Sequence, residues 1–122
     1  MPSKIVTVQI THRQYKPGVA VLEMKGSIHA GPDCQRVEHE LEAVLRESKS
    51  HVIFDLTGVT HIDSAAVGTI VTCYSRLRRS GSAMRIAGAQ GMVEGALKLT
   101  QVHRVIGLYP TASDAAAGLL AP

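Results

Sequence analysis

Residues 51–68 read HVIFDLTGVTHIDSAAVG, and this stretch decides the fold. Val52-Ile53-Phe54 is a short apolar run, too short for a helix and rich in β-branched residues, which indicates a buried strand. Thr57-Gly58 is expected to end that strand. Asp63-Ser64 then supplies short oxygen-bearing side chains, which accept hydrogen bonds from the free N–H groups at the start of a helix. The stretch therefore predicts a strand that leads into a helix and places the Ser64 hydroxyl beside a carboxylate at the positive helix end.

The helix predicted behind Ser64 runs to a glycine stop at Gly81. Before it, the sequence predicts a strand over residues 4–14, a turn at Lys16-Pro17-Gly18 and a second strand over 19–24. The apolar side chains that recur at helical spacing behind Ser64 are Val67, Ile70, Val71, Tyr74 and Leu77. The further elements predicted are a helix that begins at 30–33 with Pro32 near its first turn, a strand over 82–88, a weaker helix over 90–100, a short strand over 105–109 and a short helix after Thr111.

The order of these elements predicts an α/β fold in a single domain over residues 1–122. A hairpin followed by alternating helices and strands favours a mixed β-sheet of about four to five strands, with about four helices packed mainly on one face. The apolar strand at 52–56 should lie inside the sheet. The strand at 82–88 should run parallel to it through a right-handed crossover.

Composition narrows the classes of function. The chain has 122 residues, of which 45% are hydrophobic and 19% charged, and this balance is typical of a folded globule. Aromatic residues make up only 3% and the net charge is +3, which argues against nucleic-acid binding because single-stranded binders need stacking platforms. No segment has the length of apolar sequence that membrane insertion requires, so a cytoplasmic protein is expected. Cys34 and Cys73 fall among apolar neighbours and are interpreted as buried free thiols.

Motifs for catalysis, metals and cofactors are not evident. The glycine-rich phosphate-binding patterns are missing, and the six histidines show no ligand-like spacing with cysteines or acids, so neither a cofactor nor a metal is expected. His61, Asp63 and Ser64 suggest a hydrolase triad, but the G-x-S-x-G frame of a nucleophile elbow is absent. We therefore expect no enzyme and no catalytic residue, and a small serine hydrolase that uses Ser64 and His61 stays as a remote alternative.

Ser64 is better suited to covalent modification. A phosphoryl group would add about −1.5 to −2 charges at a helix N-terminus, whose free N–H groups and dipole tolerate anions. Asp63 would repel that charge, and a docked partner would meet a strongly hydrated dianion. The plainer alternative is that Asp63 is an ordinary N-cap and Ser64 simply the first residue of a helix.

The chain resembles the STAS domain family, of the anti-sigma factor antagonist type. The likeness begins before the first helix, at Gly26-Ser27-Ile28-His29. It is strongest in the central unit, where a strand and a turn lead to Ile62-Asp63-Ser64. It continues through Leu77–Gly81 and Leu97–Thr100. In that family the serine after the aspartate is phosphorylated by a serine/threonine kinase that doubles as an anti-sigma factor, and a PP2C-type phosphatase removes the phosphate. Only the unphosphorylated form sequesters the kinase.

Carried over to this chain, the resemblance implies that Ser64 is the phosphorylation site. It also implies a partner-binding surface formed by Asp63, Ala65, Ala66, His29, His61 and Thr69. Two features depart from the family pattern: Ala65-Ala66 replaces the frequent Ser-Gly, and His29 replaces an acidic residue. A docking subunit of a lipid-transport ATPase or a stressosome-like complex, without phosphate turnover, is therefore an alternative. A homodimer through Val59 and the early turns of the central helix is a further possibility.

Overall fold

A five-stranded mixed sheet with strand order β1-β2-β3-β4-β5 forms the centre of the molecule. The computed structural model describes residues 6–121. Strand β1 (Val8–Lys16) pairs antiparallel with β2 (Val19–Ile28), and β3 (His51–Ile62), β4 (Met84–Ala87) and β5 (Leu108–Tyr109) follow in parallel. The hairpin, the interior position of β3 and the parallel β3–β4 pair are confirmed. The first strand was predicted over residues 4–14, of which 4–5 lie outside the described residues; β1 begins later, at Val8, and continues to Lys16.

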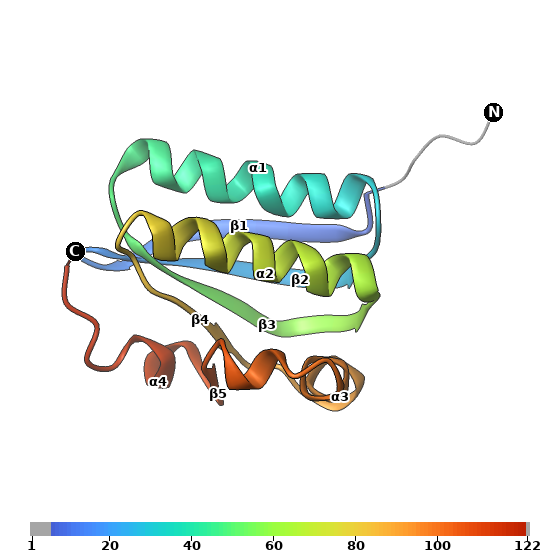
Figure 1. The fold of residues 1–122 in the computed structure, drawn as a ribbon. Helices are drawn as coiled ribbons and strands as arrows, with labels where there is room; N and C mark the ends of the chain where they lie inside the picture. Colours follow the sequence, from blue (N-terminus) through green and yellow to red (C-terminus); the bar gives the residue numbers. More distant parts are fainter. Residues whose placement is uncertain (1–5, 122) are drawn as a thin grey trace.

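Helices cover the sheet unequally. Helices α1 (Pro32–Glu47), α2 (Ser64–Arg79) and α3 (Gly91–Leu99) pack on one face, in the main core around Phe54 and Leu22. The short helix α4 (Ala112–Ala116) packs on the other face, over Val21 and Ile53. Figure 1 shows α1 and α2 lying over the sheet, with α4 apart from both. A 3₁₀ turn (Val102–Arg104) links α3 to β5. The prediction of an α/β fold with helices mainly on one face is confirmed.

Strand β3 does not end at Thr57-Gly58, so that prediction was wrong. Glu23 of β2 pairs with Asp55 and Lys25 pairs with Gly58, which leaves one extra residue in β3, a β-bulge. The Asp55 carboxylate accepts hydrogen bonds from the Thr57 N–H and hydroxyl, and a Cβ at Gly58 would lie 3.1 Å from the Met24 carbonyl oxygen. Glycine is needed here for close approach of two strands, and β3 continues to Ile62.

The central helix buries a slightly different stripe from the predicted one. Val67, Ile70 and Leu77 are buried, but Val71 is 38% exposed and Cys73 occupies the inner face. Val59 is also buried, at 3% exposure, so it is not available for a dimer face.

Both cysteines are free and buried, as predicted. Burial raises the pKa of the Cys73 thiol to about 12.

Candidate functional site

The site forms where β3 turns into α2. Ile62 is 6% exposed and fixes the end of the strand in the core, while Ala66 and Val67 bury the first turn of α2. Asp63 between them has extended backbone angles and is the N-cap, and its Oδ1 accepts a hydrogen bond from the Ala66 N–H at 2.9 Å. The predicted helix start is therefore confirmed, and Ser64 is the first residue of α2.

The second oxygen of Asp63 ties this helix start to the loop between β2 and α1. Asp63 Oδ2 accepts a hydrogen bond from the Ala30 N–H at 2.9 Å. Burial raises the pKa of Asp63, but the Ala30 and Ala66 N–H groups and the nearby His29 lower it more, so the net pKa lies below its usual value. Asp63 is thus a firmly ionised carboxylate beside Ser64.

Asp33 holds the same loop from the other side, a role that no local sequence pattern indicates. Its carboxylate is 2% exposed and accepts hydrogen bonds from the Thr7 N–H (2.6 Å), the Thr7 hydroxyl (2.6 Å), the Val8 N–H (3.1 Å) and the His29 N–H (3.0 Å). Burial raises the pKa of Asp33, but these hydrogen bonds outweigh that effect and the net pKa is lowered. Thr7 and Val8 are about 25 positions away in sequence, so local patterns could not reveal them.

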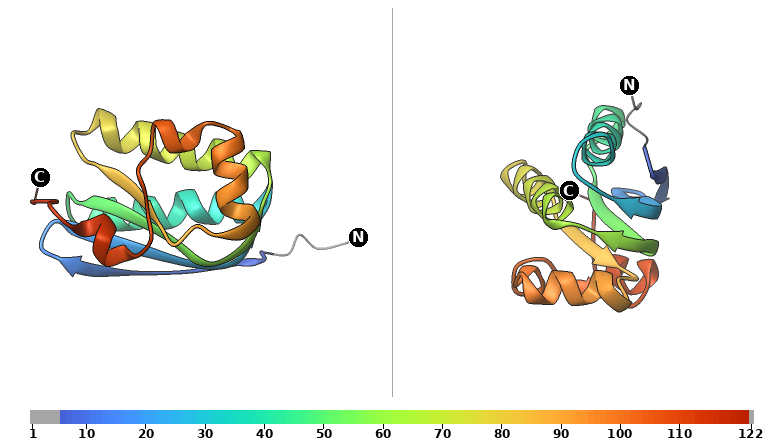
Figure 2. Two further views of the ribbon diagram at one scale, coloured as in Figure 1. Left: turned by 90° about the horizontal axis from the view of Figure 1, so that it is seen from below. Right: turned by 90° about the vertical axis from the view of Figure 1, so that its right-hand side faces the viewer.

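The two aspartates hold the loop that carries His29 against the start of α2. The Cys34 thiol adds a bond to the His29 carbonyl oxygen at 3.3 Å. The amino ends of α1 and α2 lie at the same end of the molecule, which faces the viewer in the right-hand view of Figure 2. This anchoring gives Ser64 a fixed position without enclosing it.

Ser64 itself is exposed. Its hydroxyl has no hydrogen-bond partner among residues 6–121 of the structure. Ala65, His29 and His61 are also exposed at this end. Ala66 (0% exposed) and Thr69 (8% exposed) were predicted to bind a partner, but both are buried and support the helix from within. The side chains that a partner can reach directly are therefore Ser64, Ala65, His29 and His61, with part of Asp63.

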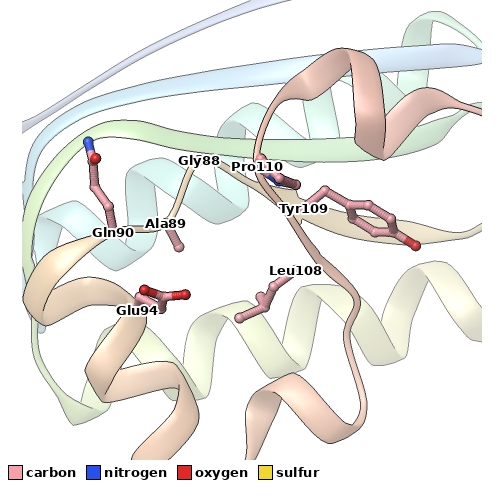
Figure 3. A pocket seen from close by; sticks show the side chains of 7 residues that line it. All are labelled: Gly88, Ala89, Gln90, Glu94, Leu108, Tyr109 and Pro110. Atoms are coloured by element: carbon pink, nitrogen blue, oxygen red, sulfur yellow. The ribbon is translucent and has the colours of Figure 1, made fainter.

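The geometry lends no support to a serine hydrolase. The His61 Nδ1 forms a hydrogen bond with the Thr60 hydroxyl at 3.0 Å, and within the described residues no base contacts the Ser64 hydroxyl. A pocket of about 370 Å³ lies where β4 and β5 meet α3, but neither Ser64 nor His61 lines it. Figure 3 shows the Glu94 carboxylate and the Leu108 side chain facing one another across this pocket, while the Tyr109 ring turns away.

Residues 6–121 also lack two other kinds of feature. No group of three or more histidine, cysteine and acidic side chains there is placed to hold a metal ion. None of the helices in that range combines the length and apolar character needed to cross a membrane.

Comparisons with known proteins identify the family. The STAS domain model matches residues 12–115. An anti-sigma F factor antagonist of Paenibacillus polymyxa is 22% identical over 97 residues, which covers 79% of this chain and 82% of that protein.

Solved structures share the fold. An anti-sigma factor antagonist from Mycobacterium paratuberculosis superposes with a TM-score of 0.76 and 22% identity, over 89% of this chain and 91% of that one. SpoIIAA, an anti-sigma factor antagonist, superposes in its unphosphorylated form with a TM-score of 0.76 and 10% identity, over 92% and 99% of the two chains. The phosphorylated form of SpoIIAA, from Bacillus, gives a TM-score of 0.68 and 10% identity over 88% and 96%. The match of the family model to most of the chain shows that this protein belongs to the STAS domain family.

Proposed function

We propose that this protein is an anti-sigma factor antagonist controlled by phosphorylation of Ser64. In this proposal the unphosphorylated form binds and sequesters an anti-sigma factor that is also a serine/threonine kinase, in the cytoplasm. Phosphorylation releases that partner, and a PP2C-type phosphatase restores the binding form. The observation that carries the proposal is the exposed Ser64 hydroxyl at the rigid start of α2, in a STAS domain whose relatives are named anti-sigma factor antagonists.

The local electrostatics support a switch at this position. An aspartate is ionised at neutral pH, and backbone N–H groups lower the pKa of Asp63 further. A phosphoryl group on Ser64 would add about −1.5 to −2 charges directly beside that carboxylate. A partner surface that fits the neutral hydroxyl would then have to desolvate a concentrated negative charge, which costs far more than burying a paired polar group.

The surface next to Ser64 carries small exposed side chains that another protein can approach. Ala65 and Gly68 are both exposed on α2, and a Cβ built on Gly68 would meet no heavy atom within 4 Å. We call Ser64, Ala65 and Gly68 the docking ridge. Small side chains there let a partner come close to the Ser64 hydroxyl, which a kinase must do to transfer a phosphoryl group.

The experiment compares Ser64→Ala and Ser64→Asp for binding to an anti-sigma-type kinase from the same genome, by calorimetry. We expect Ser64→Ala to bind like the wild type and Ser64→Asp to bind at least about tenfold more weakly, equivalent to about 1.4 kcal/mol. Ser75→Ala and Ser75→Asp are matched controls because Ser75 is exposed further along the same helix. Equal binding by both Ser64 variants would instead favour the docking subunit without phosphate turnover.

A further inference from the structure

We propose a second binding site, for a small oligophosphate, at the opposite end of α2 from Ser64. The site lies around Ser82, between the end of α2 and the start of β4. Because α2 has 16 residues, the site lies about 24 Å along the helix from Ser64. This inference is independent of the proposed function.

Two adjoining pockets meet at Ser82. The first has a volume of about 480 Å³ and is lined in part by Tyr74, Arg78 and Arg85. The second has a volume of about 390 Å³ and is lined in part by Lys49 and Arg76. Ser82 lines both, and we call the two pockets together the Ser82 groove. Its total size suits a ligand larger than a single phosphate.

The charge of the groove is one-sided. Four basic residues line it, and neither pocket has an acidic lining residue. Arg76 is paired with Glu42 at 3.2 Å. The Arg85 guanidinium donates to the Ala115 and Ala117 carbonyl oxygens, at 2.9 and 3.2 Å, so its charged end is already held on the α4 side of the sheet. Lys49 and Arg78 have no carboxylate within 4 Å among the described residues. Arg78 donates instead to the Tyr74 hydroxyl oxygen at 3.2 Å. The groove therefore concentrates unneutralised positive charge in a protein whose net charge is only +3.

Ser82 supplies a second and independent observation. The residue is 6% exposed, and in the part of the chain that the structure describes its hydroxyl has no hydrogen-bond partner. A buried polar group without a partner destabilises the folded state, because it has lost its hydrogen bonds to water. An anionic oxygen bound where the two pockets meet would accept a hydrogen bond from this hydroxyl.

The negative end of the α2 dipole accounts for only part of this charge. Basic residues in the last turn of a helix offset the partial negative charge of its carbonyl groups, which explains Arg76 and Arg78. Lys49 comes from the loop after α1, so the dipole of α2 does not explain it. The Lys49 ammonium lies 3.7 Å from the position that a Cβ on Gly81 would occupy, beside the turn that follows α2.

The arrangement favours a ligand with several phosphate groups. Arginine forks and a lysine ammonium are the side chains that proteins use for phosphate oxygens. The cations line two adjoining pockets. A single ligand can therefore contact cations in both pockets only if it carries more than one negatively charged group. Met84 and Val105 add apolar wall for an organic group attached to the phosphates.

The test is an amide NMR titration of the full chain with pyrophosphate and with tripolyphosphate. We expect saturable shifts of the Gly81, Ser82 and Ala83 amides, and at least about tenfold weaker binding in the variant Lys49→Gln/Arg78→Gln. Arg79→Gln is the matched control, because Arg79 lies in the same helical turn but lines neither pocket. Binding by this control should equal that of the wild type.

Ser82→Ala separates a ligand contact from simple charge attraction. Removing an unpartnered hydroxyl should leave the free energy of unfolding unchanged or higher, while affinity for pyrophosphate falls. The proposal is overturned if no saturable shift occurs, if Arg79→Gln weakens binding as much as the double variant, or if Ser82→Ala binds like the wild type. None of these results bears on Ser64, because Ser64→Ala should bind pyrophosphate normally.

Discussion

The carboxylate of Asp63 forms two hydrogen bonds that hold the start of α2 and the loop before α1 together. Replacing Asp63 with alanine removes both, and we expect the free energy of unfolding to fall by about 1–2 kcal/mol, as for other N-cap losses. Asp63→Asn keeps a side-chain oxygen as cap and should retain most of that stability. Urea denaturation measures both, with Asp114→Ala, exposed in α4, as the control. A loss in Asp63→Asn as large as in Asp63→Ala would contradict the capping role.

Asp33 and Asp63 also make stability depend on acid. Both have a pKa below the usual value in the folded state, so their contribution is complete above the unfolded-state pKa of about 4 and is lost as the pH falls through their lower folded values. We therefore expect the free energy of unfolding to decrease steeply below about pH 4. The variant Asp33→Asn should be less stable at pH 7 and show a shallower decrease in acid. Denaturation series at several pH values check this, and an unchanged slope in the variant would speak against it.

At the residue scale, sequence reasoning identified Asp63 and Ser64 because helix starts have a local chemical signature. The role of Asp33 was not predicted, because the local pattern indicates only that Asp33 lies at the start of a helix. The partners of Asp33 are Thr7 just before β1, Val8 in β1 and His29 in the loop before α1, and only the folded chain brings them together. The family resemblance also placed Ala66 and Thr69 on a partner surface, but both are buried, and a resemblance in sequence does not reveal which side of a helix turns inward.

At the scale of the element, the helix α2 presents its docking ridge on the side away from the core. Gly68→Gln adds a long side chain where a Cβ meets no atom within 4 Å, and it also replaces a glycine inside a helix. We expect stability to rise by about 0.5–1 kcal/mol, while binding of the anti-sigma-type kinase falls at least about tenfold.

Gly95→Gln is the matched control for this substitution. Gly95 is also exposed inside a helix, α3, and a Cβ there likewise meets no atom within 4 Å. The control should gain similar stability and bind the partner normally. If Gly68→Gln binds as well as Gly95→Gln, the docking ridge is not part of the interface.

Strand β3 was predicted correctly as a strand, but its end was predicted at the wrong residues. Thr57-Gly58 has the composition of a turn, and turn residues and bulge residues are the same few types. Whether such a pair ends a strand or bends it depends on the neighbouring strand, here Met24 and Lys25 of β2. That neighbour is set by tertiary pairing, which the local sequence does not contain.

For the whole molecule, the alternation of elements was enough to predict the α/β fold, because a parallel strand pair needs a helical crossover and the apolar β3 had to be interior. The second, smaller core under α4 was not predicted. It depends on Ala115, Ala116 and Leu119 packing on Val21 and Ile53 at one face of the sheet, and the short Ala-rich segment of α4 carries little periodic signal. The basic groove at Ser82 was not predicted either, because its cations come from elements that are separate in the sequence.

The most direct test of the account is the intact mass of the protein after incubation with an anti-sigma-type kinase from the same genome and ATP. The account predicts that the wild type and Ser75→Ala each gain the mass of one phosphoryl group, that Ser64→Ala gains none, and that a PP2C-type phosphatase reverses the gain. Phosphorylation of Ser64→Ala to the same extent as the wild type, or no gain by a wild-type protein that binds the active kinase, would contradict the claim that Ser64 is the switch.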